Sequence, residues 1–317
     1  MSYAQLKKRI DAGEVIILDG ATGTELQRRG TPMDPAAWCG PATLRHDKLL
    51  TEIHSDYIEA GSDVITANTF ATSRLVLTQA GYGNQVEEIN RRAVEAALSA
   101  RAKAPKGRNV VVAGSLSHMV PLAEGTATVD PSRIPSDSEI GDALEEQAQI
   151  LKGSGVDHIM LEMMYHPVRA RLARDAALAT GLPVWFGMSA RRAEDGRAVS
   201  FHSFADLPVD DIARLLPPTG IDVAGCMHTR AEIMAEALEG VRRRFSGPLM
   251  AYPDSGYFEM PDWRFVDVIS PERLEQFYSS WLASGVRLIG GCCGLGVEHI
   301  RAAVRARDAA ATVRSRR

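Results

Sequence analysis

The chain has 317 residues, 45% hydrophobic and 24% charged, a composition that is ordinary for a soluble globular protein. Its formal net charge of -4 argues against a broad basic surface for nucleic acid or anionic membranes. The N-terminus lacks a signal-peptide pattern and no window stays apolar long enough to span a bilayer, so we expect a cytoplasmic protein with no membrane partner.

Short apolar runs rich in β-forming residues alternate along the chain with amphipathic, helix-like segments. The eight runs cover residues 15–19, 63–68, 109–115, 156–162, 183–189, 221–226, 247–252 and 286–293. Helix candidates between them include residues 43–61, 84–102, 139–155 and 271–285, most of which end in a glycine suited to a left-handed cap. Eight strand-then-helix repeats predict a single (β/α)8 TIM barrel over residues 1–317, with a disordered basic tail at 312–317.

The ends of the predicted strands are the expected place of the active site, because barrels of this type build it there. Chemically useful side chains stand at these ends: Asp19, Asn68, Ser115, Glu162, Cys226 with His228, Tyr252, and Cys292 with Cys293. None of the ends carries a lysine, which argues against a Schiff-base lyase. The irregular stretch at residues 117–137 is expected to lie over the strand ends as a loop or lid.

Two of the four cysteines are adjacent, in the sequence "GGCCG" at residues 290–294. Adjacent cysteines rarely form a disulfide, and clustered cysteines in a reducing compartment indicate metal binding or catalysis. Zinc binds thiolate and imidazole, and catalytic zinc sites keep three protein ligands and one open position. We therefore predict a Zn²⁺ site at Cys292 and Cys293, with the third ligand taken from "GCMH" at residues 225–228, either Cys226 or His228.

Five motifs together resemble the homocysteine S-methyltransferase family. They are "LDGATGTEL" at residues 18–26, "ANTF" at 67–70, the glutamate at 162, "YPDSG" at 252–256 and "GGCCG" at 290–294. The resemblance implies a zinc-dependent barrel that transfers a methyl group from an activated donor to a thiol acceptor, homocysteine, giving methionine. A sulfonium such as S-methylmethionine is the expected donor, because the chain shows no recognisable folate or cobalamin domain.

The resemblance also implies roles for individual residues. Asp19 and Glu162 match the acidic groups that hold the amino group of homocysteine, and the backbone amides of Ala21 and Thr22 match those that receive its carboxylate. Trp38 matches an aromatic position near the active site and suits a cationic donor by cation–π attraction. Asn68, in the "ANTF" motif, is likewise expected to bind substrate; Cys39 is expected to be a bystander.

The chain departs from the family pattern at two strand ends. The family usually has G-x-N-C after the sixth strand, whereas "GCMH" places Met227 on the asparagine and His228 on the cysteine ligand. We favour His228 as the third ligand, with Cys226 as its rival. After the third strand, "GSLSHMVP" at residues 114–121 replaces a "GPYG"-like turn that borders the methyl donor. These departures leave two alternatives: a barrel with another thiol acceptor or demethylation reaction, and a non-catalytic binding barrel.

Overall fold

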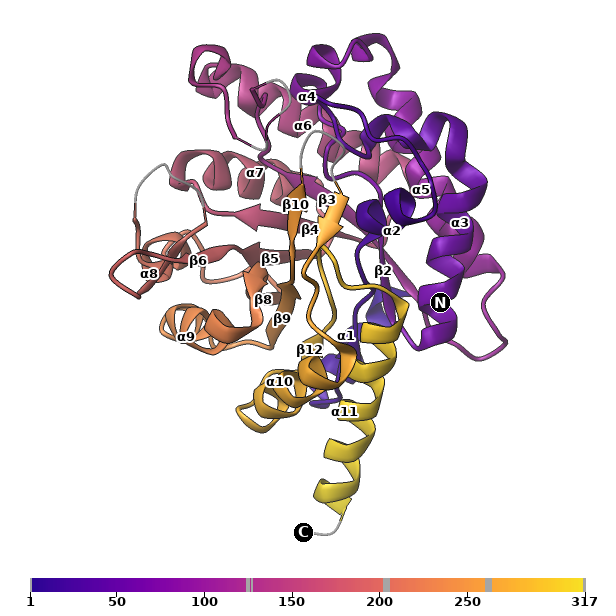
Figure 1. Cartoon of the computed structure of the whole chain (residues 1–317), viewed down its shortest axis with the longest axis vertical. Coiled ribbons are helices and arrows are strands. Elements are labelled where there is room, and N and C mark those ends of the chain that lie inside the picture. The colour runs from indigo at the N-terminus through magenta and orange to yellow at the C-terminus, as the bar shows by residue number, and fades with distance from the viewer. Residues whose placement is uncertain (1, 124–125, 127, 202–205, 260–263, 316–317) are drawn as a thin grey trace.

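The centre of the protein is an eight-stranded parallel sheet curled into a nearly closed barrel (Figure 1). The computed structural model describes residues 2–123, 126, 128–201, 206–259 and 264–315. The strand order is β1-β12-β9-β8-β5-β4-β3-β2. These strands are β1 (Ile16–Ile17), β2 (Val64–Ala67), β3 (Val111–Ser117), β4 (His158–Met164), β5 (Val184–Met188), β8 (Val223–Arg230), β9 (Leu249–Asp254) and β12 (Leu288–Ile289). All eight coincide with predicted runs, so the barrel prediction is confirmed.

Two aspartate side chains bridge the seam between β1 and β2, which are the ends of the strand order. Ile17 donates its backbone N–H to Asp63 Oδ2 at 3.0 Å, and Asp63 donates its own N–H to the Ile17 carbonyl at 2.7 Å. Further along the seam, the Thr66 N–H donates to Asp19 Oδ2 at 2.6 Å. The carboxylates of Asp63 and Asp19 thus take the place of ladder acceptors and close the barrel.

Helices follow the strands and pack around the outside of the barrel (Figure 1). They are α1 (Tyr3–Asp11), α2 (Thr22–Arg28), α3 (Thr43–Ala60), α4 (Arg74–Gln79), α5 (Val86–Ala102), α6 (Asp137–Ser154), α7 (Pro167–Ala179), α8 (Val209–Ala213), α9 (Ala231–Arg242), α10 (Pro271–Ala283) and α11 (Val297–Ser315). The four helix candidates of the sequence are confirmed as α3, α5, α6 and α10. The glycine cap is clearest after α6, where Gly155 is left-handed at φ 91°.

Several segments differ from the sequence prediction or add to it. Two antiparallel hairpins were not predicted: β6 (Ala190–Arg192) with β7 (Ala198–Ser200), and β10 (Tyr257–Glu259) with β11 (Arg264–Val266). The stretch 117–137 contains the short 3-10 helix η3 (Pro131–Arg133). The 3-10 helices η1 (Gly40–Ala42) and η2 (Gly83–Gln85) lie earlier in the chain. The tail expected to be disordered is helical through residue 315, as part of α11, and residues 316–317 lie outside the described residues.

Strand side chains alternate between the inside of the barrel and the layer beneath the helices. Met227 belongs to the inner cluster with Val223 and Tyr252, whereas Cys226 belongs to the outer cluster with Met188 and Ala251. The period of two in β8 therefore sends neighbouring residues to opposite faces. Among the described helices, none combines the length and the apolar character needed to cross a membrane.

Candidate metal centre and substrate pocket

A cavity of about 260 Å³ opens at the carboxyl ends of the barrel strands. Residues at or just after the carboxyl ends of β1, β2, β3, β4, β8, β9 and β12 line it, and most of its surface is apolar. Leu122 and Val129, which pair in an isolated bridge, also line it, so this part of the stretch 117–137 lies over the strand ends as predicted. Residues 124–125 and 127 of that stretch lie outside the described residues.

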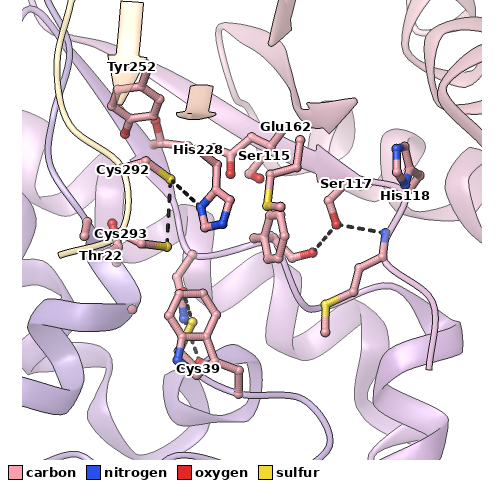
Figure 2. Close-up of a pocket in the computed structure, with 18 of the residues that line it drawn as sticks. Thr22, Cys39, Ser115, Ser117, His118, Glu162, His228, Tyr252, Cys292 and Cys293 are labelled. Atoms are coloured by element: carbon pink, nitrogen blue, oxygen red, sulfur yellow. Dashed lines mark hydrogen bonds between the residues drawn. The ribbon is translucent and has the colours of Figure 1, made fainter. Parts of the chain in front are cut away.

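Three potential metal ligands converge at one side of this cavity. Figure 2 shows the sulfurs of Cys292 and Cys293 and the ring of His228 pointing toward one another. Cys292 Sγ lies 3.9 Å from Cys293 Sγ and 3.8 Å from His228 Nδ1, and all three ligand atoms lie within 4.8 Å of one another. Two sulfurs bound to one tetrahedral zinc ion at about 2.3 Å each would lie about 3.8 Å apart. The donor set therefore fits a zinc ion in type and in spacing.

A bulge at the end of β8 turns His228 into the cavity. The register of β8 against β9 shifts between Met227 and Arg230, and His228 has a φ of 43°, which is uncommon for a residue with a side chain. A bulge of this kind re-aims a side chain that the period of two would send elsewhere. The backbone geometry thus singles out His228 from its neighbours.

The turn after β12 holds the two cysteines against the end of β9. Cys292 donates its N–H to the Pro253 carbonyl at 2.6 Å, and Cys293 accepts an N–H from Ser255 at 3.1 Å. Gly294 closes the turn at φ 82°, and a Cβ atom there would lie 2.2 Å from the Ser255 carbonyl oxygen. Only glycine fits this close approach. The glycines around the pair therefore shape the turn, as the sequence indicated.

The structure does not bring Cys226, the rival ligand, to the metal centre. Cys226 is fully buried beneath the helices and lines no part of the cavity. Among the described residues, the group of nearby metal-ligating side chains here consists of His228, Cys292 and Cys293.

The charges around this group favour a bound cation. Contact with Cys293 and burial raise the pKa of the Cys292 thiol well above its ordinary value, so the thiolate needs a nearby positive charge. Burial alone would lower the pKa of His228, but Asp254 and Cys292 beside it raise the pKa to about 9. Asp254, whose Oδ2 lies 3.7 Å from His228 Nε2, is a site neighbour that the sequence analysis missed. The sequence feature that could have identified Asp254 is its position in the motif "YPDSG", two residues after the predicted end of the strand at Tyr252.

Glu162 and Asp19 are both buried, but only Glu162 lines the cavity. Burial and the proximity of Asp19 raise the pKa of Glu162 to about 8. Burial also raises the pKa of Asp19, to about 7. Asp19 already accepts three hydrogen bonds, from the Thr66 N–H, the Thr66 hydroxyl and the Tyr252 hydroxyl at 2.6, 3.2 and 2.8 Å. The carboxylate of Asp19 therefore stabilises the barrel seam.

The first turn of α2 and the end of β2 also border the cavity. Ala21 donates its N–H to the Leu295 carbonyl at 2.9 Å, so this predicted carboxylate-binding amide is already occupied. Within the described chain, the N–H groups of Thr22 and Gly23 have no acceptor. Asn68 lines the cavity, but its amide group is occupied by the Cys39 carbonyl, the Thr43 hydroxyl and the Cys39 thiol. Asn68 thus fixes the segment that carries Trp38.

Aromatic side chains form one wall of the cavity, where the Trp38 ring packs against Gly23 of α2. Trp38 lies edge-on to Phe70 and to Phe258, with ring centroids 6.4 and 5.7 Å apart. Phe258 comes from β10, so the unpredicted hairpin contributes to the cavity. Figure 2 places His118 at the end away from the cysteines, where its Nε2 accepts the Tyr165 N–H at 3.2 Å. Cys39, expected to be a bystander, also lines the cavity.

Comparison with known proteins places this geometry in context. The family model for homocysteine S-methyltransferase matches residues 16–307. Homocysteine S-methyltransferase 4 of Zea mays is 26% identical, covering 93% of this chain and 90% of the relative. Selenocysteine Se-methyltransferase of Brassica oleracea var. italica is 28% identical, and the match covers 95% of this chain and 91% of that protein. Betaine–homocysteine S-methyltransferase 1 of Danio rerio is 26% identical, and the match covers 93% of this chain and 73% of that protein.

A solved structure supports the fold. The metallated form of the homocysteine methyltransferase MmuM from Escherichia coli superimposes with a TM-score of 0.72, at 24% identity, covering 95% of this chain and 98% of that one. Its oxidized form gives a TM-score of 0.76 at the same identity. Similarity at this level of identity establishes the shared barrel and carries no further conclusion about the site.

Proposed function

The chain belongs to the homocysteine S-methyltransferase family, and we propose that it transfers a methyl group from a small onium donor to the thiol of homocysteine, giving methionine. Zn²⁺ is the proposed cofactor, held by His228, Cys292 and Cys293. The observation that carries the proposal is the convergence of these three ligands in one cavity with Glu162 and Trp38. We place the reaction in the cytoplasm, where the cysteines stay reduced.

The chemistry of zinc suits this ligand set. When bound, Zn²⁺ lowers the pKa of an acceptor thiol and fixes its position, so no general base is required. Two thiolates and one neutral imidazole carry one negative charge less than three thiolates. We therefore expect a lower pKa for the bound thiol, which also makes its thiolate intrinsically less nucleophilic.

Residues on two sides of the cavity account for the amino-acid part of homocysteine. We assign the ammonium group to Glu162, the carboxylate that faces the cavity, with Asp19 behind it as a buried neighbour. We assign the carboxylate group to the N–H groups of Thr22, which the family resemblance supports, and of Gly23 beside it at the start of α2. The Ala21 amide, predicted from the sequence for this role, already donates to Leu295.

The aromatic wall favours a cationic donor. An onium methyl group is attracted to the faces of aromatic rings, and Trp38, Phe70 and Phe258 gather at this wall. Among the described residues that line the cavity, none is a lysine or arginine that would repel such a cation. A sulfonium such as S-methylmethionine meets this requirement, and so does a quaternary ammonium.

The reaction balances without a further reactant. The acceptor sulfur attacks the donor methyl carbon in line, so a sulfur–carbon bond forms as the bond from that carbon to the onium centre breaks. The donor leaves as a neutral sulfide or amine, and the thiol proton passes to solvent. The largely apolar lining of the cavity disfavours water, which would compete for the methyl group.

The direct test is product analysis with purified, zinc-loaded protein. Homocysteine is offered with a panel of donors that includes S-methylmethionine, trimethylsulfonium and glycine betaine, each labelled as CD₃, and labelled methionine is measured by mass spectrometry. Labelled methionine from at least one donor, and none from Cys293→Ala, supports the proposal. Bound zinc without homocysteine binding would favour another thiol acceptor, and failure to bind zinc would favour a non-catalytic barrel.

A further inference from the structure

The two ring nitrogens of His228 face different groups. Nδ1 lies 3.8 Å from Cys292 Sγ, on the side of the proposed metal, whereas Nε2 lies 3.7 Å from Asp254 Oδ2. Since one imidazole nitrogen can bind a metal only when it carries no proton, the other nitrogen must then carry it. If Nδ1 binds the metal, the proton is on Nε2, which faces the carboxylate of Asp254.

The environment of Asp254 calls for a partner of this kind. Its residue exposure is 8%, and within the described chain its Oδ1 has no hydrogen-bond partner. The ion pair observed for it in the described residues is with His228. Burying a carboxylate costs free energy unless a donor or a cation compensates. His228 is the group positioned to do so.

The backbone ties Asp254 rigidly to both parts of the metal centre. It ends β9 and pairs in register with Arg230 on β8, just beyond the bulge that carries His228. The residues on either side of it, Pro253 and Ser255, hold the turn of Cys292 and Cys293 through backbone hydrogen bonds. Movement of the Asp254 backbone relative to the ligands would therefore break the contacts that position the cysteines, whereas its side chain is not held by them.

We propose that Asp254 is a positioning residue for the metal centre: it accepts a hydrogen bond from Nε2–H of His228 and presents the unprotonated Nδ1 to the zinc ion. This inference rests on the zinc site of the proposed function. An N–H···O hydrogen bond spans roughly 2.7–3.2 Å, so the contact closes with a shift of roughly 0.5–1 Å. Asp254 also returns one negative charge to a centre that has a neutral imidazole in place of a thiolate. A carboxylate–histidine pair of this kind orients the ring and raises its basicity as a ligand.

Zinc affinity measured by competition with a chromophoric chelator tests this inference without relying on turnover. Asp254→Ala should weaken zinc binding by roughly 10- to 100-fold, the usual effect of losing such a partner. Asp254→Asn, which keeps an acceptor oxygen, should rescue part of this loss. Asp222→Ala is the matched control, because Asp222 is a partly buried carboxylate that bonds Tyr3 away from this site, and it should leave zinc affinity unchanged.

A double-mutant cycle separates positioning from direct ligation. In the His228→Ala background, Asp254→Ala should cost nothing further, because the residue through which it acts is gone. In zinc-loaded wild-type protein, long-range ¹H–¹⁵N NMR spectra should show His228 protonated at Nε2, and this signature should broaden or disappear in Asp254→Ala.

Three results bear against the inference. Undiminished zinc affinity in Asp254→Ala overturns it. An equal loss of affinity in the wild-type and His228→Ala backgrounds also overturns it, since Asp254 would then act independently of the ring. If His228→Ala and Cys292→Ala both bind zinc like the wild type, the proposed metal centre itself is wrong, and the inference falls with it.

Discussion

Glu162 and Asp19 are two buried carboxyl groups close to each other, but the residues around them differ, and so do their roles. Asp19 is saturated by Thr66 and Tyr252 and stabilises the seam of the barrel. Glu162 faces the cavity, and we propose that it meets the substrate ammonium. The family resemblance assigned the same role to both residues, because a motif match says nothing about which donors surround a side chain.

Glu162→Gln should weaken homocysteine binding and leave zinc content unchanged. A charge-assisted hydrogen bond contributes roughly 1.5–3 kcal/mol, so the dissociation constant should rise about 10- to 150-fold. Isothermal titration calorimetry with zinc-loaded protein measures this directly. Asp19→Asn is the comparison: it should lower the free energy of unfolding more than Glu162→Gln does. Unchanged homocysteine affinity in Glu162→Gln would place the ammonium elsewhere.

The raised pKa of Glu162 predicts how the stability of zinc-free protein depends on pH. Burial and Asp19 raise this pKa from an ordinary value of 4.5 to about 8 in the folded state. Between these values the folded state keeps a proton that the unfolded state has lost, so stability should fall as pH rises from about 4.5 to about 8.

Urea unfolding at several pH values in this window checks the sign. The free energy of unfolding should decline less steeply with pH in Glu162→Gln than in the wild type, because the amide does not titrate; each pKa unit corresponds to about 1.4 kcal/mol. Parallel curves for the two proteins would show that Glu162 is ionised throughout this window.

At the scale of elements, bulges decide which residues reach the cavity. Both β4 and β8 shift register near their carboxyl ends, where Met163 and His228 have φ values of 57° and 43°. The apolar runs of the sequence predicted all eight strands, because a buried strand needs apolar residues on both faces. They could not predict the bulges, which depend on how neighbouring strands and loops pack. The sequence favoured His228 over Cys226, but only the structure shows the bulge that turns His228 into the cavity.

The β10–β11 hairpin shows a second limit of the sequence. Its strands have three residues each, too short for a recognisable pattern, and the prediction ended the seventh strand at Tyr252. The structure extends β9 to Asp254 and folds the hairpin so that Phe258 meets Trp38. Both Asp254 and Phe258 were missed for this reason.

Phe258→Ala should weaken binding of the methyl donor and leave binding of homocysteine unchanged. A cation–π contact contributes about 0.5–2 kcal/mol, so the KM for an onium donor should rise about 2- to 30-fold while homocysteine affinity stays the same. Steady-state kinetics and calorimetry supply the two readouts. Tyr257→Ala is the matched control, because Tyr257 is the adjacent residue of the hairpin but is 52% exposed. Equal effects of the two substitutions would mean that Phe258 only stabilises the hairpin.

For the whole molecule, the proposed metal ligands come from two sides of β9, which lies between β8 and β12 in the barrel. A zinc ion there would link the end of β8 to the turn after β12, across β9. Binding should therefore stabilise the folded barrel against unfolding. Free zinc at 1,000 times its dissociation constant would add about 4 kcal/mol.

Zinc should accordingly raise the melting temperature, by an amount on the order of 5–10 °C. Differential scanning calorimetry with and without zinc, with EDTA reversing the effect, provides the measurement. The zinc-induced shift should disappear in Cys293→Ala and persist in Cys226→Ala, even if the latter lowers the baseline stability by altering the core. A shift lost in Cys226→Ala and kept in His228→Ala would transfer the ligand role to Cys226.

Zinc K-edge X-ray absorption, recorded before and after homocysteine is added, tests the central claim most directly. If His228, Cys292 and Cys293 hold the ion and homocysteine meets it in the open position, the spectrum should change from two sulfur neighbours to three, with one imidazole nitrogen retained throughout. Three sulfurs before homocysteine is added would contradict the role of His228. Two sulfurs both before and after, with homocysteine bound, would contradict the claim that the acceptor thiol reacts at this metal centre.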